Sequence, residues 1–234
     1  MSLNEEQRAY KMGDDVLMQK ADFLLKSMQR DAADFASRNV DGTRRNEIDD
    51  TNRQFKDLPT DPELLGLITT ATEAKDATAL ELRKRISTVR SMAETRYGKT
   101  GKYKVFNFGE LSLLPDTDLY RTAKRVVRVG TNLLTELASE GLAASMLNEM
   151  AALATDLDDN MDKVAEAEEN RDIKTQDRIR VGNKLWALMV KYADIGKSLF
   201  EFTDEARYND YVLTDGTSNS GGGNGPAPTP PPTV

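Results

Sequence analysis

The segment IRVGNKLWALMVKYADIGKSLF, residues 179–200, decides the fold class of this protein. Its apolar and small residues recur at alternating intervals of three and four positions: Ile179, Gly182, Trp186, Met189, Ala193, Gly196 and Phe200. This spacing places them along one face of an α-helix, because 3.6 residues complete one helical turn. We therefore predict a helix over about residues 173–202, with this face turned toward a core.

The same spacing predicts helices along most of the chain, over about residues 4–37, 43–58, 61–97, 115–140 and 142–171. Residues 63–114 and 116–225 contain no proline, which permits long helices. Thr60 or Asp61 is expected to cap the helix over 61–97. The 43–58 segment carries few apolar residues and is expected to lie on the surface. Residues 102–114 are predicted to form an ordered loop, with a short strand pair as the alternative, and residues 205–213 finish the domain.

Short loops between long helices make neighbouring helices antiparallel. The predicted fold is therefore all-α: an elongated, antiparallel up-down bundle of four to five long helices plus short helices, formed by residues 1–213. Residues 214–234 are rich in Gly, Ser and Asn and then in Pro and Thr. This composition predicts a disordered or extended tail that serves as a spacer. Its Pro228-Thr229-Pro230-Pro231 motif has no basic flank, which argues against recognition by a proline-binding domain.

The composition excludes several kinds of chemistry. The chain has 234 residues, a formal net charge of −7, and neither cysteine nor histidine. It therefore cannot hold a Ser-His-Asp triad, a Cys-His pair, a disulfide or a histidine- or cysteine-ligated metal. Carboxylate, lysine, tyrosine and hydroxyl chemistry remain, but no pattern singles out a catalytic group. We expect a protein that is not an enzyme and has no cofactor and no metal, and the sequence identifies no small-molecule substrate.

No run of about 18 apolar residues occurs, so we expect no membrane span. The start Met1-Ser2-Leu3-Asn4 lacks the basic and apolar regions of a secretory signal. The expected compartment is the cytoplasm, with export by a route that needs no N-terminal signal as the alternative.

Two charged segments follow one another in the sequence. Basic residues dominate between Arg83 and Arg128, and four of them share one helical face; we call them the basic stripe: Arg121, Lys124, Arg125 and Arg128. Residues 155–172 are strongly acidic, and the set that we call the acidic face is Asp158, Asp159, Asp162, Glu166 and Glu169. The two sets could pair within one chain or between copies of it. The basic stripe could also bind nucleic acid or anionic lipid, although the overall acidity and the lack of interleaved aromatic residues argue against both.

Glycines inside the apolar faces, together with one tryptophan, indicate close packing of helices. The residues concerned are Gly130, Gly182, Trp186 and Gly196. Each glycine costs about 1 kcal/mol relative to alanine inside a helix, so a close neighbour is the favoured explanation. The alternative is a glycine-lined groove for a ligand or another subunit.

Two further sets of carboxylates suggest metal binding or burial. Asp156-x-Asp158-x-Asn160 resembles the start of a calcium-binding loop, but Met161 and Ala167 stand where that loop needs glycine and glutamate. A solvated helix face is the favoured interpretation. Asp14 and Asp31 lie within an apolar face, and we expect Arg or Lys partners for them if they are buried.

Several segments resemble an uncharacterised all-helical protein family of environmental bacteria over roughly residues 60–213. The similar segments are AKRVV (123–127), RDIKTQDRI (171–179), VGNKL (181–185), KYADIGK (191–197) and YNDYVL (208–213). The resemblance implies a helical bundle and implies no activity and no catalytic residue.

These observations favour a non-enzymatic structural or interaction protein that self-associates into an oligomer or a filament-like assembly. The alternative is a binding module for a small ligand or an anionic polymer, through the glycine-lined face or the basic stripe.

Overall fold

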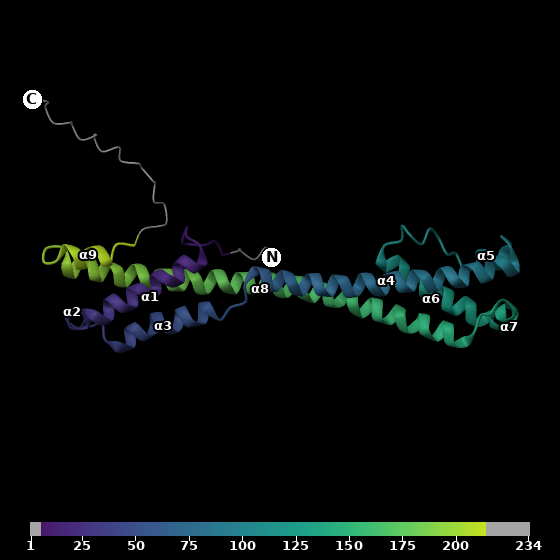
Figure 1. Cartoon of the computed structure of the whole chain (residues 1–234), viewed down its shortest axis with the longest axis horizontal. Coiled ribbons are helices and arrows are strands. Elements are labelled where there is room, and N and C mark those ends of the chain that lie inside the picture. Colours follow the sequence, from purple (N-terminus) through teal and green to yellow (C-terminus); the bar gives the residue numbers. More distant parts are fainter. Residues whose placement is uncertain (1–5, 214–234) are drawn as a thin grey trace, which may run out of the picture. The chain divides into compact units, whose positions relative to one another are not determined.

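The structure of the chain, a computed structural model, describes residues 6–213. Every regular element within these residues is helical, so the protein is an all-α helical bundle protein as predicted (Figure 1). The tail predicted over residues 214–234 lies outside the described residues.

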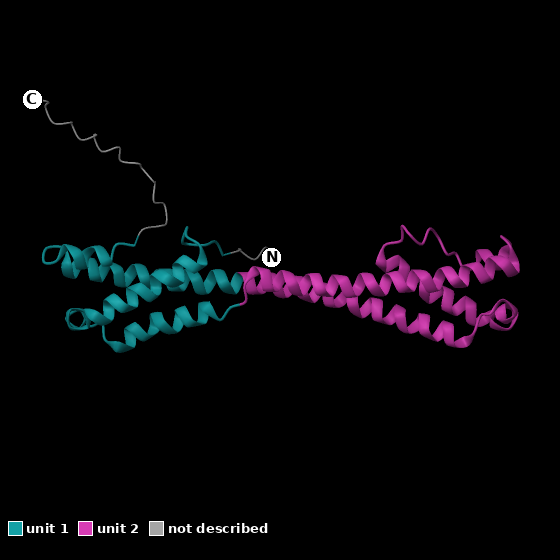
Figure 2. Ribbon diagram, in the orientation of Figure 1, with its two compact units in different colours: residues 1–58, 176–234 teal, residues 59–175 magenta. Residues whose placement is uncertain are grey.

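The chain forms two compact units (Figure 2). Unit 1 contains the described residues up to Leu58 and those from Gln176 onward, and unit 2 contains Pro59–Thr175. The long helix α8 (Ala144–Phe200) contributes its first part to unit 2 and its second part to unit 1. Unit 1 is therefore assembled from the two ends of the sequence, whereas unit 2 is one continuous segment.

Unit 1 combines α1 (Asp14–Arg30), α2 (Ala32–Ala36), α3 (Gly42–Lys56), the second part of α8, and α9 (Glu205–Asp210). Its core includes Leu24, Phe35, Phe55 and Met189, all of them buried. Helix α3 is largely exposed, as expected for a surface helix, but one of its faces is buried. Its few apolar side chains, Ile48 and Phe55, lie on one face together with Thr51 and Asn52, and all four are buried.

Unit 2 combines α4 (Asp61–Tyr97), α5 (Gly101–Lys104), α6 (Asp116–Asn132), α7 (Leu134–Leu137), the 3₁₀-helix η1 (Ala138–Glu140), and the first part of α8. Its core is a separate apolar cluster that includes Leu82, Ile86, Phe106, Val126 and Met150. The predicted cap at Thr60 is confirmed, because Thr60 and Glu63 form a capping box at the start of α4.

Residues 98–115 link α4 to α6 in unit 2, and we call them the connection. It contains α5 and runs back along the unit, so α6 starts beside the middle of α4 (Figure 1). Lys75 of α4 pairs with Asp116 at 2.7 Å, and Tyr97 at the end of α4 bonds Glu136 of α7 at 3.1 Å. Helices α4 and α6 therefore run parallel, which departs from the antiparallel order predicted for neighbours.

Helices α4 and α8 do run antiparallel within unit 2. The Asn160 amide donates to the Thr78 hydroxyl at 3.1 Å, and Arg85 pairs with Glu149 at 2.9 Å. Residue numbers thus rise along α4 as they fall along α8.

Several predicted helix boundaries are wrong, among them the end of the first helix, which is interrupted at Asp31 between α1 and α2. The helices expected over 142–171 and 173–202 are one helix, α8. Neither Gly nor Pro occurs at residues 171–173, so nothing there ends the helix. The helix expected over 115–140 ends at Asn132, and η1 ends at Gly141, which has a φ of 94°. The first helix begins at Asp14 instead of about residue 4, because residues 7 and 9 bond the amide of Asn183 on α8 through their backbone.

Candidate interaction surfaces

The basic stripe lies on α6, but its four members do different work. Arg121 is 76% exposed and lies 3.7 Å from Asp118 one turn earlier, while Lys124 sits over the ring of Tyr120 at 5.5 Å. Arg128 is exposed and forms no ion pair within the described residues. Arg125 is half-buried, and its guanidinium donates to the carbonyls of residues 106 and 107 at 3.0 and 3.2 Å. Arg125 is therefore a structural residue, and the other three face outward.

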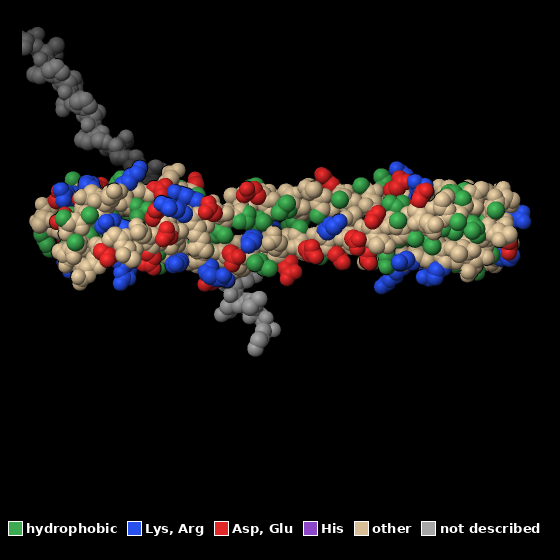
Figure 3. All heavy atoms as spheres, turned by 90° about the horizontal axis from the view of Figure 1, so that it is seen from below, with side chains coloured by type: hydrophobic (Ala, Val, Ile, Leu, Met, Phe, Trp, Pro, Cys, Tyr) green, Lys and Arg blue, Asp and Glu red, His purple; other side chains and the backbone are tan. Residues whose placement is uncertain are grey.

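The acidic face lies on the part of α8 that belongs to unit 2. Asp158 is half-buried, and Asp159, Asp162, Glu166 and Glu169 are exposed. None of the five forms an ion pair with any residue that the structure describes. Acidic side chains are also visible on the surface drawn in Figure 3, where hydrophobic side chains form small groups among charged ones. The acidic face thus has no cationic partner within residues 6–213.

Pairing between the two charged sets within one chain is not observed. The stripe uses Asp118 and backbone carbonyls, and the carboxylates that pair with α4 come from other positions, such as Glu149 and Asp116. The arrangement leaves two outward cations, Lys124 and Arg128, and all five carboxylates without an ion-pair partner among the described residues, while Arg121 pairs only with Asp118.

The glycine positions are occupied by side chains and form no open groove. A Cβ at Gly182 would collide with the Tyr10 hydroxyl, and one at Gly196 would collide with the ring of Tyr211. At Gly130, a Cβ would come within 2.9 Å of Leu147 Cδ2. Trp186 is half-buried and packs against the core of unit 1. The close neighbours are thus mostly tyrosine rings from the ends of the chain, which spacing within one helix does not reveal.

Asp31 is the most buried of the carboxylates that the sequence pattern singled out within the described residues. Its side chain is 0% exposed, pairs with Arg30 at 2.7 Å, and accepts a hydrogen bond from the Tyr211 hydroxyl at 2.7 Å. Arg207 approaches to 3.4 Å. The hydrogen bond from Arg30 is the main cause that lowers the pKa of Asp31, and burial raises the pKa of Tyr211. These contacts join α1 to the segment after α9.

Asp14 has a similar environment at the other end of α1. It pairs with Arg178 at 2.6 Å and accepts a hydrogen bond from the Tyr10 hydroxyl at 2.9 Å. Burial is the main cause that raises the pKa of Tyr10. Both aspartates therefore have the arginine partners expected from the sequence, and both serve packing in unit 1.

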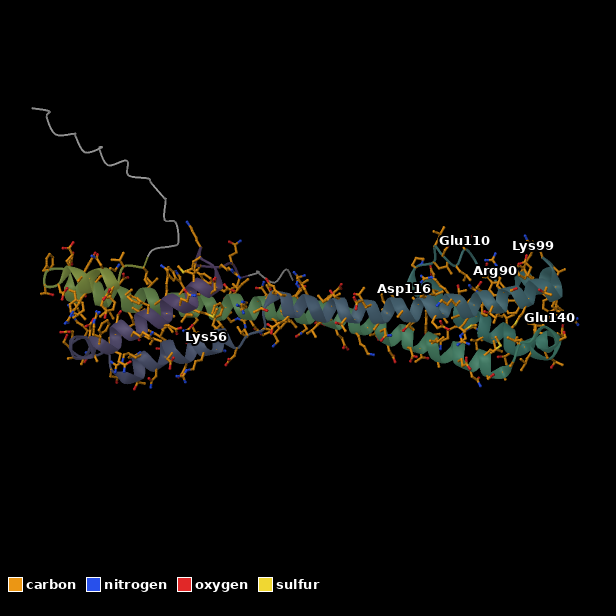
Figure 4. All side chains as sticks on the ribbon, viewed as in Figure 1. Lys56, Arg90, Lys99, Glu110, Asp116 and Glu140 are labelled. Atoms are coloured by element: carbon orange, nitrogen blue, oxygen red, sulfur yellow. The ribbon has the colours of Figure 1, made fainter. Side chains whose placement is uncertain are left out.

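A third charged cluster was not anticipated from the sequence, and it holds the connection in place. Arg83 donates to the carbonyls of residues 111 and 114 at 3.1 and 2.9 Å. Both Arg83 and Lys75 reach Asp116, which lies where α6 begins (Figure 4). The bond to Asp116 is the main cause that raises the pKa of Lys75. The only local signal was the Pro115-Asp116 helix start, which does not reveal partners on α4.

Two surface hollows flank the connection, and both touch Asn107 and Gly109. The larger has a volume of about 400 Å³ and is lined by Arg90, Tyr103, Lys104 and Phe108 as well. The smaller has a volume of about 200 Å³ and includes Arg121 and Arg125 of the basic stripe in its lining. Asn107 and Gly109 have φ angles of 48° and 69°, so the backbone between the hollows is in the left-handed region.

Residues 6–213 contain no group of three or more acidic side chains arranged to hold a metal ion. No described helix is both long and apolar enough to cross a bilayer.

Comparisons with known proteins add no functional information. No family model, no curated protein and no solved structure matches this chain. The resemblance to a bacterial helical family therefore stays a prediction.

Proposed function

We propose that this protein is a non-enzymatic helical protein that self-associates, with the basic stripe of one copy contacting the acidic face of another. The observation that carries this proposal is the acidic face, whose five carboxylates have no cationic partner among the described residues of their own chain. Like charges along one helix repel each other by a few tenths of a kcal/mol per pair, so a cationic partner would stabilise them.

The dimensions of the two surfaces support this contact. The stripe extends over residues 121–128 and the acidic face over residues 158–169, which correspond to about 11 and 17 Å of helix at 1.5 Å per residue. Where each copy offers its stripe to one neighbour and its acidic face to another, the contact is heterologous. Repetition of a heterologous contact generates a ring or an open filament. The expected assembly grows at low ionic strength, where exposed charges are least screened.

A non-enzymatic role is supported by the use of the buried ionisable groups. Asp31, Asp14 and the tyrosines that bond them hold helices together, and they do not line either hollow beside the connection.

The test is an exchange of charges between the two surfaces. The basic-reversed variant carries Arg121→Glu, Lys124→Glu and Arg128→Glu, and the acid-reversed variant carries Asp159→Lys, Asp162→Lys and Glu166→Lys. Arg125 stays unchanged because it holds the connection. Sedimentation velocity and negative-stain electron microscopy at about 20 mM and about 500 mM salt measure assembly. We expect each variant alone to stay monomeric and an equimolar mixture of the two to assemble.

A matched control changes the same amount of charge elsewhere. Lys11→Glu, Lys26→Glu and Arg38→Glu alter exposed residues of unit 1, and we expect this variant to assemble like the unaltered protein. A wild-type protein that stays monomeric at low salt and high concentration, or a variant mixture that stays monomeric, would contradict the proposal.

Binding of an anionic polymer is the second candidate, and the smaller hollow favours it because two stripe arginines line it. Nucleic acid is the less favoured polymer because the chain as a whole is acidic. Binding of a labelled polyanion such as heparin should fall steeply with salt and disappear in the basic-reversed variant. Equal binding by that variant would exclude this candidate.

A further inference from the structure

The larger hollow beside the connection combines a cavity with cations that lack carboxylate partners. Its volume is about 400 Å³, and its lining contains no acidic residue. Arg90 and Lys104 supply two positive charges to it, and neither forms an ion pair with a described residue. The only side-chain hydrogen bond of Arg90 joins its Nε to the Tyr103 hydroxyl at 3.3 Å. The terminal guanidinium nitrogens of Arg90 thus have no partner within residues 6–213.

Some other cations of unit 2 have carboxylate partners: Lys102 pairs with Glu136 at 2.6 Å, and Lys75 pairs with Asp116. The two cations that line the hollow have none among the described residues. An uncompensated guanidinium and an uncompensated ammonium at one cavity form an environment that attracts an oxyanion, which both groups bind through charge-assisted hydrogen bonds.

The backbone of the connection adds a donor to the same site. Arg125 binds the carbonyls of Phe106 and Asn107. In a trans peptide unit the carbonyl and the next N–H point in opposite directions, and the described chain contains no cis peptide bond. The N–H of Phe108 therefore points away from Arg125, and no residue of the described chain accepts a hydrogen bond from it. Phe108 lines the larger hollow, and Arg125 does not.

The hollow also has an apolar wall. Tyr103 is half-buried, and its ring lies 5.6 Å from that of Phe108, which in turn stacks on Phe106 at 5.0 Å. The stack holds Phe108 in the core, and the half-buried Tyr103 ring lines the hollow together with the two cations. The cavity is larger than a bare ion needs, so a group beyond the oxyanion fits against this ring.

We infer that this hollow binds a small organic oxyanion, a phosphate or carboxylate group attached to a flat apolar ring. Arg90 and Lys104 hold the charged oxygens, the Phe108 N–H donates to one of them, and the Tyr103 ring packs against the apolar part. This site is distinct from the self-association surfaces, because neither Arg90 nor Lys104 belongs to the basic stripe.

Isothermal titration calorimetry with four probes tests the assignment: phenyl phosphate, benzoate, inorganic phosphate and benzyl alcohol. We expect the first two to bind more tightly than inorganic phosphate, which lacks the ring, and more tightly than benzyl alcohol, which lacks the charge. The tighter of phenyl phosphate and benzoate identifies the oxyanion. Arg90→Gln and Lys104→Gln should each weaken it about tenfold, as expected for one lost charge-assisted hydrogen bond.

The matched controls are Arg96→Gln and Lys99→Gln, which remove exposed cations close in sequence that do not line the hollow. They should leave affinity within about twofold. Lys104 is exposed, so its variant reports on binding even if Arg90→Gln weakens the fold. A shift of the Phe108 amide signal in ¹⁵N–¹H spectra on addition of phenyl phosphate should accompany binding.

Three results would overturn the inference: no saturable binding of phenyl phosphate or benzoate, equal loss in the control variants, or equal affinity for benzyl alcohol. The basic-reversed variant keeps Arg90 and Lys104, so it should bind the probe while it fails to assemble. The two proposals can thus fail separately.

Discussion

Units 1 and 2 are both built from amphipathic helices, but they secure those helices in different ways. Unit 1 contains buried charge: the Asp31 carboxylate is inaccessible to solvent and receives Arg30, Arg207 and the Tyr211 hydroxyl. The core cluster of unit 2 is apolar, and its arginines act at the periphery, where Arg83 and Arg125 donate to backbone carbonyls of the connection.

The difference follows from the order of the chain. Unit 1 joins segments 180 residues apart, and its long-range contacts include side-chain pairs such as Tyr211 with Asp31. Unit 2 is continuous, so its arginines need only hold a nearby segment in one conformation. Carboxylates titrate in acid, whereas arginine bonded to a carbonyl stays charged at every accessible pH. Unit 2 also contains paired carboxylates, Asp116 and Glu136, but their side chains are 22% and 42% exposed, whereas that of Asp31 is 0% exposed. Unit 1 should therefore respond to pH more strongly than unit 2.

Trp186 provides a way to observe the units separately. It is the only tryptophan of the chain and packs against the core of unit 1, whereas far-ultraviolet circular dichroism reports helices of both units. Urea titrations followed by both signals measure the predicted changes.

The largest effect is expected from Asp31→Ala. This change leaves the buried Tyr211 hydroxyl without its acceptor and removes the carboxylate shared by Arg30 and Arg207. We expect a loss of about 3 kcal/mol from the free energy of unfolding reported by Trp186. Asp34→Ala is the control, because Asp34 pairs with the same Arg207, at 3.5 Å, but is exposed. This change should cost less than about 0.5 kcal/mol. Equal losses in the two variants would show that the buried carboxylate is unimportant.

The pH dependence of unit 1 tests the same group. The pKa of Asp31 in the folded chain lies below its ordinary value of 3.8, so the unfolded chain takes up a proton first as the pH falls. The stabilising contribution is complete above about pH 5 and declines below about pH 4, down through the folded pKa. The Trp186 transition should move to lower urea in that range, and Asp31→Ala should reduce the slope. An unchanged slope in the variant would assign acid sensitivity to other carboxylates.

The next effect is expected from Gly196→Ala, which places a methyl group against the buried ring of Tyr211. Overpacking of a core costs about 1–3 kcal/mol, and the better helix propensity of alanine recovers about 1 kcal/mol of it. A methyl group at Gly196 would collide with the ring, so the cost should lie at the upper end of that range and the net loss by Trp186 fluorescence should be about 2 kcal/mol. A gain in stability would mean that Tyr211 can move aside without cost.

In unit 2, Arg125→Gln should cost about 1–2 kcal/mol, because it breaks hydrogen bonds to the carbonyls of residues 106 and 107. The loss should appear in circular dichroism, leave the Trp186 transition unchanged, and stay constant between about pH 4 and 8. Arg121→Gln is the matched control on the same helix and should have almost no effect. A loss that grows in acid would place a titrating carboxylate in this contact.

The smallest effect is expected from Gly66→Ala. Gly66 lies inside α4, and no atom lies within 4 Å of the position that an alanine methyl group would take, so nothing opposes the gain in helix propensity. Stability of unit 2 should rise by about 0.5–1 kcal/mol. The opposite signs of Gly66→Ala and Gly196→Ala would separate backbone propensity from packing, and a loss at Gly66 would contradict this distinction.

Much of the candidate site could not be predicted from the sequence. The basic stripe was identified correctly as one face of α6, but the spacing could not show that Arg125 binds the connection while Arg121 faces outward. Arg90 and Lys104 belong to different elements, and only the return of the connection brings them to one hollow. Helical periodicity indicates on which side of its helix a side chain lies. It carries no information on which residues of other segments lie opposite that side chain.

The sequence by itself determined the helical class, a helix cap at Thr60 or Asp61, and the absence of histidine and cysteine chemistry. These properties depend on composition or on residues within one or two turns, where local sterics and hydrogen bonding decide. Only the tertiary structure decided that α8 is continuous, that one face of α3 is buried, and that α4 and α6 run parallel. It also decided the contacts of Asp31 and Gly196 with Tyr211. Each of these depends on partners far apart in the chain, whose meeting depends on the packing of the whole unit rather than on local preference.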